Sequence, residues 1–294
     1  MALVKVVTDS SSDIPPEVAQ ELGITVIPLY LRFGNEVYRD GVDISADQFY
    51  AKLAHSRTLP KTSTSSPGDF AKIYNQLASE TNTILSVHLS SRYSSALNAA
   101  IVAKDYAPEG CTVRVIDSKS VSMGCGLVAI AAAREAKAGA DLEQIMQTVN
   151  KVIWRTHIVG MISDINYLLG GRRLSLPGAH LLLGKIGTVL RFKLVGEIYE
   201  AGKVRGIGMY LSEAKALEKL GHCVTEFQTI EEMAILYAKQ PGWAQDFADR
   251  ITSLLTPNRI YYARLGGATG VHGGPKAIAV AFIEEKTANS FRAN

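Results

Sequence analysis

Hydrophobic and polar positions alternate in blocks over the first half of the chain. Short β-branched or leucine-rich runs predict strands, at Val4–Thr8, Thr25–Arg32, Thr83–Leu89 and Thr112–Asp117. Between and after them, helical spacing predicts helices at Pro16–Leu22, at a segment capped by Ser45, and at Gly68–Ser79, Ser95–Tyr106, Ser122–Lys137 and Leu142–Val152. This order predicts an α/β domain over residues 1–155, with a mostly parallel, Rossmann-like sheet.

The pattern changes after about residue 155. Strand signals follow one another more closely, at 189–199 around a turn at Gly196, and at Val224–Gln228, Ala234–Tyr237, Arg259–Arg264 and Ala277–Glu284. Helices are predicted at Ser212–Leu220, with Ser212 as N-cap, and at Pro241–Leu255, whereas Tyr167–Ser175 is predicted as a loop or helix end. Residues 156–294 therefore predict an α+β domain with a mixed or antiparallel sheet. A crevice between the two domains is the expected ligand position.

Clusters of Ser, Thr and Gly stand out in the first half, mostly where a predicted strand ends. They cover Thr8–Pro15, Thr62–Phe70, Ser90–Ala96 and Asp117–Gly124. Hydroxyls and helix N-terminal amides at one sheet edge favour binding of an anion or carboxylate without a dedicated cation.

Helix capping is the competing interpretation of these clusters. One cap needs one residue, so the four hydroxyls of Ser90, Ser91, Ser94 and Ser95 exceed that need, as do those of 62–65. Asp9 and Asp13 are candidate metal or base carboxylates, but capping of local backbone is the favoured interpretation.

One histidine is a candidate for ligand contact. His272 lies in the glycine-rich segment 270–275, where the main chain can approach a ligand closely. A structural role for this side chain remains the alternative.

Composition narrows the possible functions. The chain has 294 residues, 47% hydrophobic and 20% charged, with a net charge of +3 and no run of five basic residues, which argues against nucleic-acid binding. Three widely spaced cysteines favour a reducing cytoplasm over a disulfide framework or a zinc site. No signal peptide is expected, and the apolar runs are too short for a membrane span.

Signatures of common enzymes are incomplete in this sequence. The segment 178–187 resembles a Walker loop, but its glycine spacing is one residue too long and Ile186 replaces the Ser or Thr. Gly206-Ile207-Gly208 lacks the third glycine of a dinucleotide loop, and neither a GxSxG nor an HExxH motif occurs. We therefore expect no cofactor and no metal.

Taken together, the clusters resemble the DegV family over nearly the whole chain. The resemblance rests on TDSSSDIP at 8–15, DGVDIS at 40–45, TSTSSPGDF at 62–70, LSSRYSSA at 89–96, IDSKSVSMGCG at 116–126, GGRRLS at 170–175, KVRG at 203–206 and VHGGP at 271–275.

The resemblance implies a fatty-acid-binding subunit of a bacterial fatty acid kinase. It implies a long-chain fatty acid in a tunnel between the two domains, its carboxylate held by Thr62, Ser94 and His272, with Ser95 beside them. Nearby loops would contribute further residues, namely Ser10, Ser63, Ser122, Arg173 and Gly273. The helix 122–137 and the stretch Leu181–Leu183 are candidate tunnel walls, and equally ordinary core.

The resemblance also implies partners. The chain would not be an enzyme by itself; it would present the acid to a separate ATP-dependent kinase, which makes acyl phosphate for phospholipid metabolism, with Arg205 as a partner contact. A cytoplasmic protein of this kind would touch membranes only transiently, to exchange lipid.

The chain departs from the family pattern at several positions. Tyr93-Ser94-Ser95 replaces Leu-Ser-Gly, Thr64-Ser65 follows where Gln-Pro is usual, Arg172 replaces a Gly beside Arg173, Ile207 replaces a basic residue, and Lys276 replaces the later Gly. Two alternatives stay open: an acyl hydrolase or transferase that uses Ser94 and His272, and a carrier or sensor of another hydrophobic acid, for which Tyr93 in place of Leu is the reason.

Overall fold

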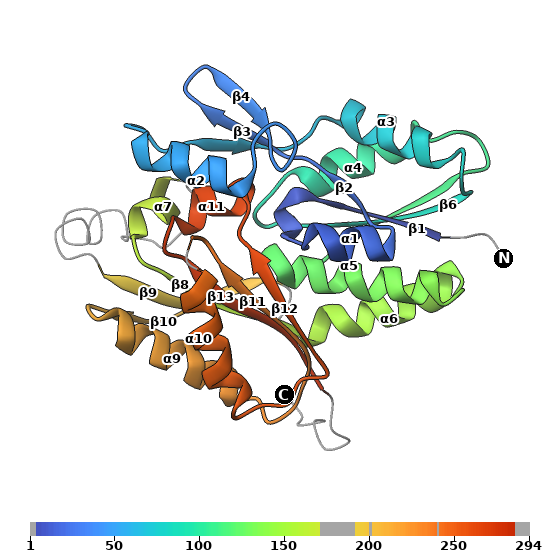
Figure 1. Cartoon of the computed structure of the whole chain (residues 1–294). Coiled ribbons are helices and arrows are strands. Elements are labelled where there is room, and N and C mark those ends of the chain that lie inside the picture. Colours follow the sequence, from blue (N-terminus) through green and yellow to red (C-terminus); the bar gives the residue numbers. More distant parts are fainter. Residues whose placement is uncertain (1–3, 171–191, 200–201, 240, 286–294) are drawn as a thin grey trace.

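The structure, a computed structural model, describes residues 4–170, 192–199, 202–239 and 241–285. Two large sheets lie on either side of a central helical layer (Figure 1). This arrangement confirms the predicted α/β class, with a parallel sheet in the N-terminal part and a mixed sheet in the C-terminal part.

The parallel sheet has the strand order β2-β1-β6-β7. Its strands are β1 (Val4–Asp9), β2 (Thr25–Ile27), β6 (Thr83–His88) and β7 (Thr112–Asp117), and all neighbours run parallel. Successive side chains of β1 point to opposite faces. Val7 packs with the helices α3 (Pro67–Leu77) and α4 (Ala96–Lys104), whereas Val4 and Val6 face the central helices.

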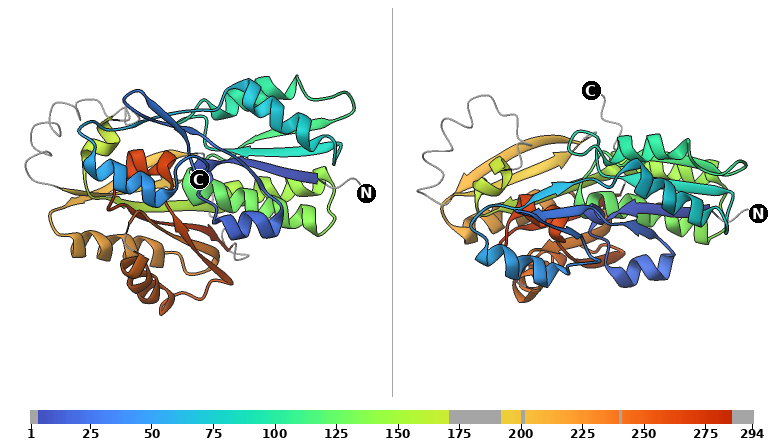
Figure 2. Two further views of the ribbon diagram at one scale, coloured as in Figure 1. Left: turned by 45° about the horizontal axis from the view of Figure 1, so that its top comes forward. Right: turned by 90° about the horizontal axis from the view of Figure 1, so that it is seen from above.

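The mixed sheet has six strands in the order β10-β9-β8-β13-β11-β12. They are β8 (Thr156–Ile162), β9 (Lys193–Tyr199), β10 (Lys203–Tyr210), β11 (Ile230–Tyr237), β12 (Arg259–Arg264) and β13 (Ile278–Glu284). Neighbours are antiparallel except for β11 and β12. The helices α9 (Glu213–Thr225) and α10 (Pro241–Thr252) cover the face turned away from the central layer (Figure 2).

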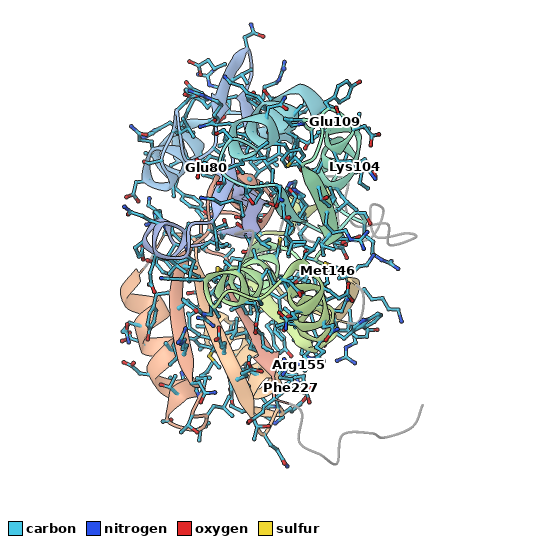
Figure 3. The ribbon with its side chains drawn as sticks, turned by 90° about the vertical axis from the view of Figure 1, so that its right-hand side faces the viewer. Glu80, Lys104, Glu109, Met146, Arg155 and Phe227 are labelled. Atoms are coloured by element: carbon cyan, nitrogen blue, oxygen red, sulfur yellow. The ribbon has the colours of Figure 1, made fainter. Side chains whose placement is uncertain are left out.

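The central layer contains α1 (Pro16–Leu22), α5 (Ser122–Lys137) and α6 (Leu142–Arg155). The sequence of α5 is apolar nearly all round, and the helix is buried because it packs against β1 and β6 on one side and against β8 and β13 on the other. Arg134 near its end donates hydrogen bonds to Glu232 and Tyr261 of the mixed sheet. Figure 3 shows Met146 of α6 in this layer, with Glu80 and Lys104 above it and Phe227 below.

A small third sheet lies at one end of the molecule, with the order β4-β3-β5. It is antiparallel and contains β3 (Tyr30–Phe33), β4 (Glu36–Arg39) and β5 (Lys61–Ser63). The helices α2 (Ala46–His55) and α11 (Gly267–Gly273) pack beside it. Ser45 caps α2 in a capping box with Gln48, as predicted. The predicted strand Thr25–Arg32 is in fact two strands in two sheets.

Other sequence predictions were wrong. Val224–Gln228 is not a strand, because α9 continues to Thr225 and buries Val224. Gly196 is not at a turn: it lies inside β9, where it pairs with Gly160 and Gly206. The 3-10 helix η1 (Ser10–Ser12) and the helix α11 were not predicted.

Two further predictions have no complete test. The short helix α7 (Ile165–Gly170) lies in the predicted loop region, whereas 171–175, the Walker-like segment and Leu181–Leu183 lie outside the described residues. The division at residue 155 stays a prediction. One apolar cluster runs from Val4 to Ile283 across it.

Candidate ligand site

The site begins with two residues far apart in the sequence. Thr62 Oγ1 and His272 Nε2 lie 3.5 Å apart, although 210 positions separate them. Thr62 lies in the edge strand β5, and His272 lies near the end of α11, which packs against β3 and β5. Both side chains are partly exposed, so a ligand atom can reach them.

Close approach of α11 depends on its glycines. A Cβ on Gly267 would lie 2.2 Å from Leu31 Cδ1, and one on Gly270 would lie 2.6 Å from the Tyr50 hydroxyl. Larger residues at these positions would therefore push α11 away from the small sheet. The glycine-rich segment predicted close approach of the main chain to a ligand, which stays a prediction; in the structure Gly267 and Gly270 let α11 approach Leu31 of β3 and Tyr50 of α2.

Thr62 and His272 together can hold a carboxylate. The hydroxyl and the imidazole N–H are both donors, and a carboxylate oxygen accepts from either. His272 is in the last turn of α11, where the carbonyl end of the helix favours a positive charge. The pair therefore offers a donor set suited to an acid without a Lys or Arg.

The Ser94 loop is tied to its own helix and to the second sheet. Ser94 Oγ accepts a hydrogen bond from the amide of Ala96, 3.1 Å away, at the start of α4. Ser95 occupies the N-cap position, makes no side-chain cap bond and is exposed. The Tyr93 hydroxyl donates to the carbonyl oxygen of Gly202 at 2.5 Å.

The remaining predicted site residues lie in several different elements. Ser10 Oγ accepts from the amide of Leu29, and the exposed Ser63 pairs with Tyr30 within the small sheet. Ser122 donates a hydrogen bond to Asp13, and Gly273 ends α11. Arg173 lies outside the described residues.

Arg205 lies away from Thr62, in the edge strand β10. Its guanidinium donates to Glu197 Oε2 at 2.5 Å and lies 5.1 Å from the centre of the Tyr199 ring. Its side chain is 62% exposed, which leaves it available to a partner.

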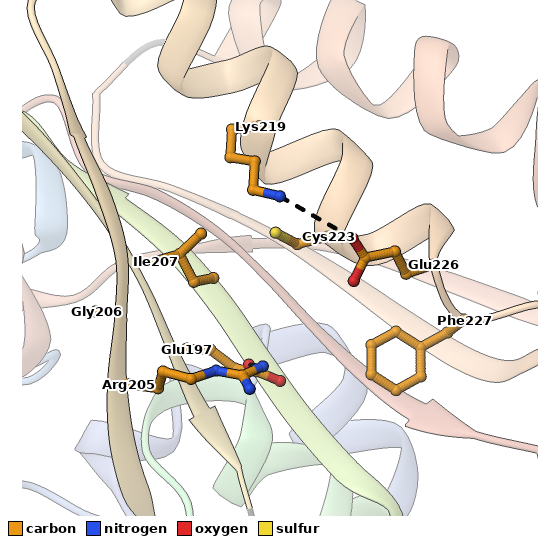
Figure 4. Close-up of a pocket in the computed structure, with 8 residues that line it drawn as sticks. All are labelled: Glu197, Arg205, Gly206, Ile207, Lys219, Cys223, Glu226 and Phe227. Carbon is orange, nitrogen blue, oxygen red and sulfur yellow. Dashed lines mark hydrogen bonds and ion pairs between the residues drawn. The ribbon is translucent and has the colours of Figure 1, made fainter.

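A cavity of about 320 Å³ adjoins Arg205, between β9, β10 and α9. Figure 4 shows Arg205 beside Glu197 on the sheet, with the ion pair of Lys219 and Glu226 above them on the helix. Its other lining residues are Gly206, Ile207, Cys223 and Phe227. Its charges pair with one another, and Thr62 and His272 are not among its lining residues, so this cavity is separate from the Thr62–His272 pair.

Sequence reasoning missed a buried polar chain below the first cluster. His88 Nδ1 lies 2.8 Å from Asp9 Oδ2, His88 Nε2 lies 2.6 Å from Ser86 Oγ, and the Tyr74 hydroxyl donates to Ser86 at 2.8 Å. Asp9 also accepts from the amide and hydroxyl of Ser11. The hydrogen bonds join Asp, His and Ser as in a hydrolase triad, but Asp9, Ser86 and His88 are all 0% exposed. We therefore assign these three buried side chains a structural role.

The described residues contain neither a membrane-spanning helix nor a metal-ligand cluster. No described helix is long and apolar enough to cross a membrane. Within the same part of the chain, no group of three or more His, Cys, Asp or Glu side chains could hold a metal ion.

Comparison with known proteins decides the family. The model of the DegV family, described as uncharacterised protein, matches residues 3–285. The chain belongs to the DegV family. A DegV domain-containing protein of Halalkalibacterium halodurans is 32% identical over 97% of this chain and 100% of its own length. A DegV domain-containing protein of Deinococcus radiodurans is 31% identical over 95% of this chain and 97% of its own.

Solved DegV structures share the fold. A DegV family protein of Thermus thermophilus, described by its fatty acid binding, is 25% identical with a TM-score of 0.85, over 97% of this chain and 100% of that one. A stearic acid-binding protein of Eubacterium ventriosum superposes with a TM-score of 0.84 at 22% identity, over 96% and 98% of the chains.

Proposed function

We propose that this DegV protein binds one long-chain fatty acid and holds its carboxylate at the Thr62–His272 pair, with the Ser94 loop beside it. The observation that carries the proposal is the pair itself, in which two donors from distant parts of the chain lie 3.5 Å apart. Its relative from Thermus thermophilus, described by fatty acid binding, supports the same ligand class.

The energetics suit such a ligand. A carboxylate removed from water needs hydrogen bonds or it takes up a proton, and each charge-assisted bond contributes roughly 1.5–3 kcal/mol. Burial of the acyl chain contributes roughly 0.8 kcal/mol per CH2. An acyl chain of ordinary length therefore supplies most of the affinity, and Thr62 and His272 orient the acid.

Native mass spectrometry of the purified protein, followed by lipid extraction, tests the ligand. An added mass that matches a fatty acid supports the proposal. A protein that stays unliganded after incubation with palmitate and oleate contradicts it.

Variants test the residues. Thr62→Ala and His272→Ala should each weaken fatty acid binding roughly 10- to 150-fold, the effect of one charge-assisted bond. The exposed residues Thr58 and His55 offer matched controls, because Thr58→Ala and His55→Ala make the same chemical changes nearby. Unchanged affinity in the folded Thr62→Ala/His272→Ala double variant would contradict the site.

We further propose that the bound acid is presented to a separate ATP-dependent fatty acid kinase. The acid's carboxylate oxygen would attack the γ-phosphorus of ATP, forming acyl phosphate and releasing ADP. Donors such as Thr62 and His272 bind the carboxylate without covalent chemistry, which leaves its second oxygen free to react. The exposed Arg205 guanidinium is the proposed contact to the kinase.

Trapping of acyl phosphate by hydroxylamine tests this step. This chain, ATP and the catalytic subunit of a bacterial fatty acid kinase should yield acyl hydroxamate, and this chain with ATP alone should yield none. Arg205→Ala should lower the yield of acyl hydroxamate without changing fatty acid affinity. Arg57→Ala, at another exposed arginine, should leave both the yield and the affinity unchanged. Equal yields from the two variants would exclude Arg205 as the contact.

A further inference from the structure

The first amides of α11 are held by two carboxylates from the N-terminal part of the chain. Asp40 Oδ1 accepts from the amide of Gly267 at 2.9 Å, and Asp40 Oδ2 accepts from the amide of Ala268 at 3.1 Å. Asp13 Oδ1 accepts from the amide of Gly266 at 2.9 Å and from the Thr269 hydroxyl at 3.1 Å. We call Asp13 and Asp40 the α11 clamp.

A clamp of this kind is more than a helix needs for capping. An ordinary N-cap is one side chain at the start of the helix itself. In α11 the N-cap is Gly266, which has no side chain, and the caps come from residues more than 220 positions earlier. Both carboxylates are buried, with Asp13 7% and Asp40 4% exposed.

Because α11 is short, its position depends on contacts with the clamp residues Asp13 and Asp40. Helices as short as α11, with seven residues, do not form alone in water, so surrounding contacts fix them. Carboxylates at the amide end also interact favourably with the helix dipole. The clamp therefore sets the height and the axis of α11 above the small sheet.

His272 lies at the other end of this helix. It follows Gly267 by five residues, or about 7.5 Å along the axis. Gly267 and Gly270 keep α11 against Leu31 and Tyr50, so the helix behaves as one rigid piece between the clamp and Thr62. A tilt at the clamped end displaces the imidazole from the Thr62 hydroxyl.

We infer that Asp13 and Asp40 are positioning residues for the acid-binding site: they hold α11 so that His272 meets Thr62. The inference rests on the proposed function for its ligand, a fatty acid carboxylate. In this inference Asp13 and Asp40 do not contact the acid; they act through α11, and the acid is held by His272 and Thr62.

The charge of Asp13 offers a way to separate geometry from electrostatics. The pKa of Asp13 is raised to about 7: burial is the largest cause and the charge of Asp40 adds to it, while hydrogen bonds from Ser122, Gly266 and Thr269 offset part of the rise. Tyr50 of α2 is a further titratable group beside Asp13 among the described residues. Asp13→Asn keeps an oxygen for Gly266 and Thr269, and its amide can donate to the Ser122 hydroxyl. Asp13→Ala removes all three bonds.

Nuclear magnetic resonance of the His272 ring tests the position of the helix without any ligand. The ring signals are assigned with His272→Ala in protein labelled at histidine. In folded Asp40→Ala and Asp13→Ala the His272 signals should move toward those of exposed histidines such as His55. Asp13→Asn should restore the original signals, and Asp40→Asn, with one acceptor oxygen, should restore them in part. Unchanged His272 signals in both folded alanine variants would overturn the inference.

Affinity for a fluorescent fatty acid, cis-parinaric acid, tests the functional consequence. Asp40→Ala should weaken binding about tenfold or more, and Asp13→Asn should bind within about twofold of the unmodified protein. If the unmodified protein binds no fatty acid, the proposed function fails, and the ring signals still decide the clamp. If both alanine variants move the ring signals but bind normally, the positioning role is overturned.

A milder variant covers the case in which the alanine variants do not fold. Thr269→Val removes one bond of the clamp and keeps a β-branched side chain, so a smaller shift of the ring signals and about threefold weaker binding are expected. Thr252→Val in α10 is the matched control, because its hydroxyl bonds only to carbonyls of its own helix. Identical behaviour of these two folded variants would overturn the inference.

Discussion

The Tyr93 hydroxyl donates a hydrogen bond to the carbonyl oxygen of Gly202, 2.5 Å away and 109 positions later. This bond joins the loop that contains Ser94 to the tip of the β9–β10 hairpin. Gly202 has a φ of +80°, and a Cβ there would lie 2.9 Å from the carbonyl oxygen of Lys119, so the tip is seated closely on the parallel sheet's loops. Tyr93 thus links the two large sheets at the Ser94 loop.

Tyr93→Phe should loosen the hairpin tip and leave the ring in place. Loss of one hydrogen bond costs about 0.5–1.5 kcal/mol, so amide hydrogen exchange at 203–206 should rise roughly two- to tenfold. Mass spectrometry of exchanged peptides measures this. Tyr106→Phe is the control, since that side chain is 66% exposed. Equal exchange in both variants would show that the Tyr93 bond does not hold the hairpin.

Gly267→Ala should destabilise the protein. Its Cβ would meet Leu31 at 2.2 Å, Asp40 Oδ1 at 2.9 Å and Phe49 at 3.1 Å, and overpacking of this kind costs roughly 1–3 kcal/mol. Guanidinium denaturation measures the free energy of unfolding. Gly221→Ala in α9 is the control: its nearest atom is 3.9 Å away, and alanine there should stabilise the helix by up to ~1 kcal/mol. A neutral Gly267→Ala would mean that α11 has room to move.

Asp13→Asn should change how stability depends on pH. The pKa of Asp13 is raised from 3.8 to about 7 by burial, so the folded protein keeps a proton that the unfolded chain loses between these values. Stability from this group is therefore present below pH 4 and lost as pH rises toward 7. Urea unfolding at pH 5 and pH 8 should show Asp13→Asn gaining stability relative to the unmodified protein as pH rises.

Asp43→Asn is the control for this pH effect. A hydrogen bond from the Arg39 side chain lowers the pKa of Asp43 to about 2, so Asp43 is ionised in both states over this range. Its stability difference should not change between pH 5 and pH 8. A pH-independent difference for Asp13→Asn as well would contradict the raised pKa of Asp13.

His88→Leu should lower the free energy of unfolding, because it leaves the buried Asp9 carboxylate and the Ser86 hydroxyl without their hydrogen-bond partner. The expected cost is on the order of 3 kcal/mol. His55→Leu, at an exposed histidine, should cost little. A fluorophosphonate probe should not label Ser86 in the unmodified protein, since that side chain is 0% exposed. Labelling there would reveal a reactive serine and contradict the structural role of Asp9, His88 and Ser86.

Regular periodicity made several elements predictable. The sequence analysis placed α5 at Ser122–Lys137 and β12 at Arg259–Arg264, and both have those bounds. Ser45 and Ser212 cap the helices that were expected to follow them, because a capping side chain acts through local hydrogen bonds. Such features depend on neighbours in sequence, so the sequence alone suffices.

The elements that were missed depend on contacts from distant residues. Helix α11 has three glycines among its seven residues, a composition that disfavours a helix, and it forms because Asp13, Asp40 and the small sheet hold it. Gly196 was predicted at a turn, yet it lies within β9, where a Cβ would be 3.3 Å from the carbonyl oxygen of Arg205. At α11 and at Gly196, tertiary packing determines the backbone structure against the local propensity of glycine.

Some residues of the candidate site and its surroundings were also predictable from the sequence, and others were not. The family resemblance indicated Thr62 and His272, which the structure brings together, and Ser94, which bonds within its own loop. Asp40 was visible only as part of a motif, and His88 was not singled out. Their importance arises from pairings 79 to 228 positions apart, which single-residue patterns do not contain.

The shared helix α5 limits how the proposed lipid can enter and leave. Its side chains belong at once to the layers under the parallel sheet and under the mixed sheet, so parting the two sheets would expose this helix along its length. Exchange of the proposed lipid by such an opening would have to break the core contacts of α5 with both sheets. We therefore expect the proposed lipid to exchange at the periphery, where the Tyr93–Gly202 hydrogen bond holds the β9–β10 tip. The lifetime of the proposed loaded state should then follow the strength of this attachment, which can change with little effect on the free energy of unfolding of the whole protein.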